Sequence, residues 1–166
     1  AFKEKLAANT IYSRVELTAF APGNSGDIAP AGSADVVLTF RNLHNWYGQG
    51  GDEAMVTIFK DFYTALKPGG VLGVVEHRLP ADQADGDWTK SGYFPQQLAI
   101  TLAEQAGFVL EQSSEINANP KDTAEHPRGV WTLPPVMRLG EEDKAKYQAI
   151  GESDRMTLKF RKPVAQ

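Results

Sequence analysis

Hydrophobic and polar positions divide this chain into strand-like and helix-like stretches that alternate along the sequence. The run DVVLTF, residues 35–40, is apolar and β-branched on both faces, which predicts a central parallel strand covered by helices on either side. The run VLGVVEH, residues 71–77, has the same character. Between them, the apolar positions of residues 52–67 recur with helical spacing. A strand, a helix and a strand in this order predict a βαβ unit.

The alternation continues toward the C-terminus. Residues 95–106 carry a helical apolar stripe that begins at Pro95 and stops before Gly107, and FVLEQSSEI, residues 108–116, follows as a strand. The last segment, DRMTLKFRKP, residues 154–163, alternates apolar and polar side chains as a strand buried on one face does, which predicts an antiparallel last strand in a mainly parallel sheet. The irregular segment 117–153, with one helix candidate at residues 141–150, is either a lid or a surface excursion.

The N-terminal region has a weaker pattern. AFKEKLAAN predicts a helix, and SRVELTAF, residues 13–20, alternates like a strand near a sheet edge. A loop rich in glycine and proline, residues 21–32, precedes the central strand. Because the sequence starts with Ala1 inside a predicted helix, we expect further chain before it.

Composition limits the classes of function. A length of 166 residues with 42% apolar side chains fits a single α/β domain over residues 1–166. A net charge of −4 without a basic block argues against a nucleic-acid partner, and no apolar run is long enough to span a membrane. The absence of cysteine excludes disulfides and thiolate chemistry. We expect a cytoplasmic protein acting on a small molecule; a periplasmic location and a homo-oligomer stay open.

Candidate chemistry follows the two predicted inner strands. RNLHNW comes directly after residues 35–40, and EHR, residues 76–78, ends the next strand. Ligands of open α/β sheets bind beyond the carboxyl ends of the strands, so His44 and His77 are expected on one rim. Asn42 can orient a donor, and a neutral imidazole can act as a general base near pH 7. The competing interpretation is an ordinary polar loop with Asn42 as a turn former. The three histidines, His44, His77 and His126, are widely separated in the sequence, so no metal site is predicted.

Several segments together resemble a known family. ADVVLTFRNLHNW, ALKPGGVLGVVEHR, AEQAGFVL and DRMTLKFRKP look like the second two-thirds of a class I S-adenosylmethionine-dependent methyltransferase, in particular a bacterial group of predicted methyltransferases. The resemblance covers about residues 13–163. It implies a Rossmann-like sheet and S-adenosylmethionine as cofactor. It also places the expected binding residues at the ends of two strands: Arg41, Asn42, Leu43 and His44 by the methionine end and the acceptor, and Thr18, Ala19 and Phe20 by the adenine.

The chain departs from this family at its N-terminal side. The glycine-rich loop after the first strand and the acidic residue that ends the second have no counterpart, and neither PGNSG nor GQGG lies between a buried strand and a helix start. We therefore expect that N-terminal strand–helix units are missing and that this chain binds the cofactor weakly.

Three hypotheses follow. The first is a methyltransferase in which Asn42 and His44 position a small-molecule acceptor and His77 assists its deprotonation. The second is a methyltransferase-like binding or assembly module without catalytic activity. The third, a nicotinamide-dependent Rossmann enzyme, is disfavoured because its glycine fingerprint is also missing.

Overall fold

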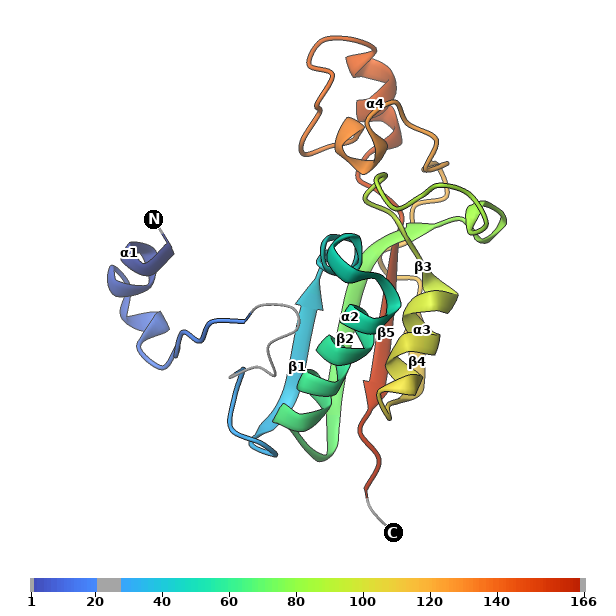
Figure 1. Cartoon of the computed structure of the whole chain (residues 1–166). Helices are drawn as coiled ribbons and strands as arrows, with labels where there is room; N and C mark the ends of the chain where they lie inside the picture. The colour runs from blue at the N-terminus through green and yellow to red at the C-terminus, as the bar shows by residue number, and fades with distance from the viewer. Residues whose placement is uncertain (1, 21–27, 165–166) are drawn as a thin grey trace.

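A mixed β-sheet forms the centre of the protein (Figure 1). The computed structural model describes residues 2–20 and 28–164. The sheet has the order β1 (Ala34–Phe40), β2 (Leu66–Leu79), β5 (Arg155–Arg161) and β4 (Val109–Ser114). A two-residue strand, β3 (Phe94–Pro95), pairs with the end of β2. Four of the strands predicted from sequence are therefore present as β1, β2, β4 and β5.

The strand directions correct the prediction of a mainly parallel sheet. Strand β1 is parallel to β2, but β5 lies between β2 and β4 and is antiparallel to both. The antiparallel last strand is confirmed. Two of the three long pairings are therefore antiparallel. The sequence did not reveal this, because the alternation within a strand shows which face is buried but not which strands lie on either side.

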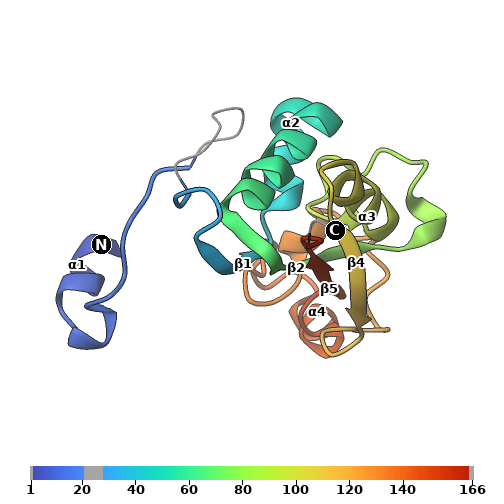
Figure 2. The same ribbon diagram turned by 90° about the horizontal axis from the view of Figure 1, so that it is seen from below.

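Two helices cover one face of the sheet: α2 (Leu43–Ala65) and α3 (Gln96–Gln105) (Figure 2). Their apolar stripes pack on the buried side chains of β2 and β5, as the helical spacing predicted. Helix α2 is kinked, because Gly50 and Gly51 have non-helical backbone angles. The core side chains are, among others, Met55, Ile58, Phe59, Phe62, Leu72, Val74, Phe94, Leu102, Met156, Leu158 and Phe160.

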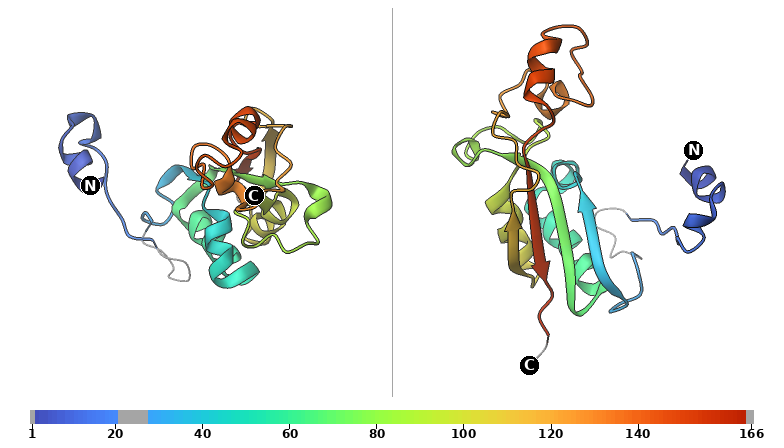
Figure 3. Two further views of the ribbon diagram at one scale, coloured as in Figure 1. Left: turned by 90° about the horizontal axis from the view of Figure 1, so that it is seen from above. Right: turned by 180° about the vertical axis from the view of Figure 1, so that it is seen from behind.

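Strand β1 was expected to be central and covered on both faces, and this is wrong. It hydrogen-bonds only to β2 within the described part of the chain, and the side chains of Val36, Leu38 and Phe40 are 52%, 60% and 55% exposed. Seen from behind, this face of the sheet lies in front of both helices (Figure 3). Strands β2 and β5, each of which has a neighbour on both sides, are the inner strands instead.

The N-terminal segment does not join the sheet. It contains α1 (Phe2–Ala7), which confirms the predicted helix, and a short 3-10 helix, η1 (Thr10–Tyr12). The strand predicted at residues 13–20 is absent: Val15 and Leu17 are both 48% exposed, and an alternating sequence forms a strand only where a neighbour accepts its hydrogen bonds. The predicted loop at 21–32, with PGNSG, lies mostly outside the described residues.

Residues 117–153, here called the cap segment, rise above the carboxyl ends of β1 and β2 (Figure 1). The segment contains a 3-10 helix, η3 (Gly129–Thr132), and α4 (Lys144–Ile150), within the predicted helix candidate. A further 3-10 helix, η2 (Ala81–Gln83), follows β2. In residues 2–20 and 28–164, none of the helices combines the length and the apolar character that a bilayer crossing requires.

Candidate active site

The chain turns sharply from β1 into α2 at Arg41. Its φ of 58° is unusual for a residue other than glycine, and its backbone N–H donates to the Val75 carbonyl at 2.8 Å. Asn42 follows as the residue before the helix, and its side-chain amide donates to Thr39 Oγ1 at 3.1 Å. The turn thus fixes the start of α2 against the ends of β1 and β2.

His44, in the first turn of α2, lies against the buried carboxylate of Glu76. Its Nδ1 is 3.1 Å from Glu76 Oε1, and its backbone N–H donates to Oε2 at 3.2 Å. Glu76 is fully buried and also accepts the backbone N–H of His77 at 2.8 Å. A carboxylate accepts hydrogen bonds only, so this contact places the proton on His44 Nδ1 and leaves Nε2 as the basic nitrogen.

His77 lies beside His44, with the ring centroids 5.6 Å apart. Its Nδ1 contacts the hydroxyl of Ser153, at the end of the cap segment. Burial lowers the pKa of His77 to about 4; Glu76 opposes this shift, whereas His44, Arg41 and Arg155 add to it. His77 is therefore neutral near pH 7 and is suited to hydrogen bonding more than to taking up a proton.

A cavity of about 370 Å³ opens between the strand ends and the cap segment. The strand side supplies Phe40, Arg41, Asn42, His44, Asn45 and His77, and the cap segment supplies Val130, Trp131, Pro134, Pro135 and Val136. The structure thus brings Arg41, Asn42, His44 and His77 together, as expected for one rim. A cavity of this size with a few convergent polar groups suits a small molecule.

The other residues expected to bind cofactor lie elsewhere. The side chain of Leu43 is buried in the core. Thr18 and Ala19 border a separate hollow with residues of α1, and the Thr18 hydroxyl donates to the Ile28 carbonyl. Phe20 packs on Trp46 and Phe62, with ring centroids 5.8 Å apart in both pairs.

Glu76 received no site role from sequence, although it belongs to the EHR motif. The sequence did contain a sign of this role. Leu72, Val74 and Glu76 occupy every second position of β2, so their side chains share one buried face, and a carboxylate buried there requires a hydrogen-bond donor. Its partner lies 32 positions earlier in the chain, so the pairing was not visible in the local pattern.

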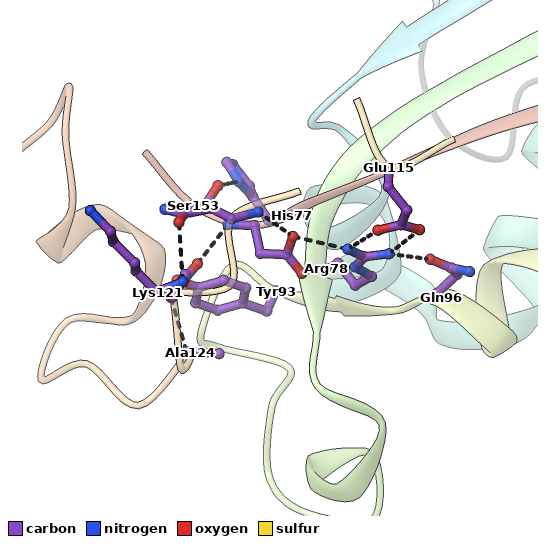
Figure 4. A network of polar contacts seen from close by, with 11 residues as sticks. His77, Arg78, Tyr93, Gln96, Glu115, Lys121, Ala124 and Ser153 are labelled. Atoms are coloured by element: carbon purple, nitrogen blue, oxygen red, sulfur yellow. Dashed lines mark hydrogen bonds and ion pairs between the residues drawn. The ribbon is translucent and has the colours of Figure 1, made fainter. Parts of the chain in front are cut away.

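A second polar cluster attaches the cap segment to the loop after β2 (Figure 4). The carboxylate of Asp122 accepts hydrogen bonds from Tyr93 Oη, His126 Nε2, and the N–H groups of Ala124 and Asp154. Burial by itself would raise the pKa of Asp122, but these hydrogen bonds lower it below its ordinary value. The cluster fixes both ends of the cap segment.

Arg78 extends this cluster to the strand ends. Its guanidinium donates to both carboxylate oxygens of Asp154 and of Glu115, and these bonds raise its pKa (Figure 4). Across the described ranges, no three histidine, cysteine, aspartate or glutamate side chains converge as a metal site would require.

Comparison with protein-family models and with curated proteins gives no match. Among solved structures, the chain is similar to the cyclase SpnF, with a TM-score of 0.59 and 17% identity over 98% of this chain and 61% of SpnF. It is also similar to an S-adenosylmethionine-dependent methyltransferase from Methanosarcina mazei, with a TM-score of 0.53 and 12% identity over 85% of this chain and 65% of that protein. The chain has the class I methyltransferase fold. The methyltransferase SibL agrees, with a TM-score of 0.57 and 18% identity over 97% of this chain and 39% of SibL.

The methyltransferase fold leaves the reaction open. The chain spans less than two thirds of the length of each of these three proteins, and one of them is described as a cyclase. At such low identity the comparisons define the fold alone, and function depends on the chemistry of the site.

Proposed function

We propose that this protein is an S-adenosylmethionine-dependent methyltransferase that acts on a small molecule with a dissociable proton. The observation that carries the proposal is the contact of His44 with the buried carboxylate of Glu76 at the edge of the cavity. A histidine oriented by a carboxylate is a common general base, because the carboxylate fixes the tautomer and stabilises the protonated ring.

In this mechanism His44 Nε2 accepts the proton of the acceptor's hydroxyl group, while Nδ1–H keeps its hydrogen bond to Glu76. S-adenosylmethionine, when bound, supplies an electrophilic methyl group. The deprotonated oxygen is then a better nucleophile, and the main task of the protein is to hold it in line. The side-chain oxygen of Asn42 is available to orient the acceptor, since its NH₂ group is engaged by Thr39.

His77 has a different role here from the one expected from sequence. Because its pKa is about 4, it stays neutral and takes up a proton poorly near pH 7. We assign deprotonation to His44 and assign His77 to hydrogen bonding with the acceptor or with a bound water. Its contact with Ser153 links this position to the cap segment.

The described residues fit part of the cofactor. The backbone of Asn42 and Leu43, directly after the turn at Arg41, would hold its methionine end. The group Thr18, Ala19 and Phe20, assigned to the adenine, belongs to a separate region. Within the described ranges the outer edge of β1 has no strand partner, which supports the expectation of additional N-terminal strand–helix units.

The test compares His44→Asn with the unchanged protein in a labelled-methyl transfer assay against a panel of hydroxylated small molecules. The assay is run with the 166-residue chain and with a version extended by the codons that precede Ala1. Asparagine keeps a donor toward Glu76 but removes the basic nitrogen, so turnover should fall by about 100-fold or more. Gln49→Ala, an exposed residue of α2 outside the cavity, is the control. Full turnover of the His44→Asn protein would refute the proposal.

A binding module without catalysis is the second candidate, favoured by the missing glycine-rich loop and acidic residue. It predicts that small molecules bind in the cavity while no methyl group is transferred by either version of the chain.

A further inference from the structure

The cavity has two chemically different walls. The wall from the strand ends is polar apart from Phe40, with a cation at Arg41 and imidazoles at His44 and His77. The opposite wall, from the cap segment, is apolar over Val130, Trp131, Pro134, Pro135 and Val136. A ligand that satisfies both walls has a polar side and a flat or rigid apolar body.

Trp131 is held next to the proposed base. Its ring lies edge-on to His44, with centroids 6.1 Å apart, and the Arg138 guanidinium lies 5.0 Å from its ring centre. Its backbone carbonyl accepts the Arg138 N–H at 2.9 Å. A fixed indole beside a base favours an aromatic ring over a flexible alkyl chain, because aromatic pairs add attraction beyond the area they bury.

Arg41 is an exposed cation without a carboxylate partner among residues 2–20 and 28–164. The two other arginines near this end of the sheet are paired, Arg78 with Asp154 and Glu115, and Arg155 with Glu152. The left-handed backbone of Arg41 sets its side chain at the rim of the cavity, and residues in such conformations cluster at functional sites. An anionic group on the ligand would give this guanidinium the partner it lacks.

We infer that the acceptor is an aromatic hydroxy acid: a planar ring against Trp131, a phenolic hydroxyl at His44 Nε2, and a carboxylate at Arg41. The inference rests on the proposed function for the role of His44, but the binding that it predicts does not require methyl transfer. A phenol also suits the proposed base, since its pKa near 10 makes its proton far easier to remove than that of an alcohol.

The test measures binding to the 166-residue chain by calorimetry, with para- and meta-hydroxybenzoate as probes. At least one of them should bind about 10-fold or more tightly than phenol, which lacks the carboxylate, and than the matching hydroxycyclohexanecarboxylate, which lacks the flat ring. Equal affinity for the aromatic and the cyclohexane acids, or no binding of either hydroxybenzoate, would overturn the inference.

Substitutions of two cavity residues test whether hydroxybenzoate binds in this cavity. Trp131→Leu and Arg41→Gln should each weaken hydroxybenzoate binding about 10-fold or more, while Arg128→Gln, an exposed arginine of the cap segment outside the cavity, should not. Unchanged binding in both cavity variants would place the ligand elsewhere. If Trp131→Leu disturbs folding, the affinities of the unchanged protein for hydroxybenzoate, phenol and the cyclohexane acid still test the inference.

The two proposals fail in different ways. Hydroxybenzoate that binds at Trp131 and Arg41 but is never methylated supports the inferred ligand class and contradicts the methyltransferase proposal. Methylation that depends on His44 but proceeds equally on non-aromatic acceptors supports the proposed function and overturns the inference.

Discussion

His44 and Glu76 form a buried hydrogen-bonded pair across the boundary between α2 and β2, with Nδ1 and Oε1 3.1 Å apart. Glu76 reaches this position because it continues the core-facing side of β2 after Leu72 and Val74. The pair couples a residue that faces the cavity to a carboxylate that solvent does not reach.

The first prediction concerns this carboxylate. Glu76→Gln keeps the shape of the side chain but removes the negative charge that stabilises protonated His44. We expect kcat to fall by about 10- to 100-fold and KM to change far less. The loss in kcat should be smaller than the full contribution of a general base, because His44 itself is retained. Steady-state kinetics over a range of pH measure this. Glu111→Gln, which removes a carboxylate of β4 that pairs with Lys159 and Arg161 of β5, should leave kcat unchanged. Equal losses in both variants would contradict the assignment.

The second prediction concerns pH and stability. The pKa of His77 is about 4 in the folded protein and about 6.5 when unfolded, so the unfolded chain binds more protons between these values. Stability should therefore fall as pH decreases from about 6.5 to 4, by up to about 3 kcal/mol from this residue. Urea unfolding of the protein and of His77→Asn at several pH values measures the difference. Parallel pH dependences for the two proteins would show that His77 is not responsible.

The third prediction concerns the close approach of the cap segment to the loop after β2. A Cβ atom added at Gly129 would overlap the Ser91 carbonyl oxygen, and Gly129 has a φ of +56°. We expect Gly129→Ala to destabilise the protein by about 2–4 kcal/mol, from backbone strain and the clash together. Gly140→Ala is the matched control, since Gly140 has a φ of +64° but open space around it. Thermal unfolding of both variants should show the larger loss at Gly129; equal losses would assign the effect to φ alone.

The fourth prediction concerns Asp122, whose buried carboxylate accepts four different donors. Asparagine replaces one of the two carboxylate oxygens by an NH₂ group, which would face a hydrogen-bond donor and leave it without an acceptor. We therefore expect Asp122→Asn to cost about 2–4 kcal/mol. Hydrogen exchange should become faster in the cap segment first, while β2 and β5 stay protected. The exposed Asp82→Asn is the control, and unchanged exchange in the cap segment would contradict the anchoring role.

The fifth prediction concerns the cofactor. The sequence lacks the glycine-rich loop and the acidic residue that would contact S-adenosylmethionine, and hydrogen bonds to charged groups contribute about 1.5–3 kcal/mol each. The 166-residue chain should therefore bind S-adenosylmethionine more weakly than about 1 mM, whereas an N-terminally extended version should bind in the micromolar range. Calorimetric titration of both compares them directly. Micromolar binding by the short chain would show that other residues replace the missing elements.

The sequence by itself determined the elements whose burial pattern is local. The apolar stripes of α2 and α3 and the one-sided alternation of β5 were visible because each element buries its own regularly spaced side chains, whatever its neighbours are. The meeting of His44 and His77 was also predictable, since His44 follows β1, His77 lies near the end of β2, and the carboxyl ends of parallel strands share one edge.

Only the tertiary structure decided which strands are neighbours and which distant residues meet. The composition of β1 predicted a central strand, yet Val36, Leu38 and Phe40 face solvent within the described structure, and residues 13–20 alternate without pairing. Glu76 and His44 are 32 positions apart, and Trp131 reaches the cavity from the irregular cap segment. Local patterns record how a residue relates to its own helix or strand, whereas these contacts depend on how separate elements pack, which the periodicity of any one segment does not contain.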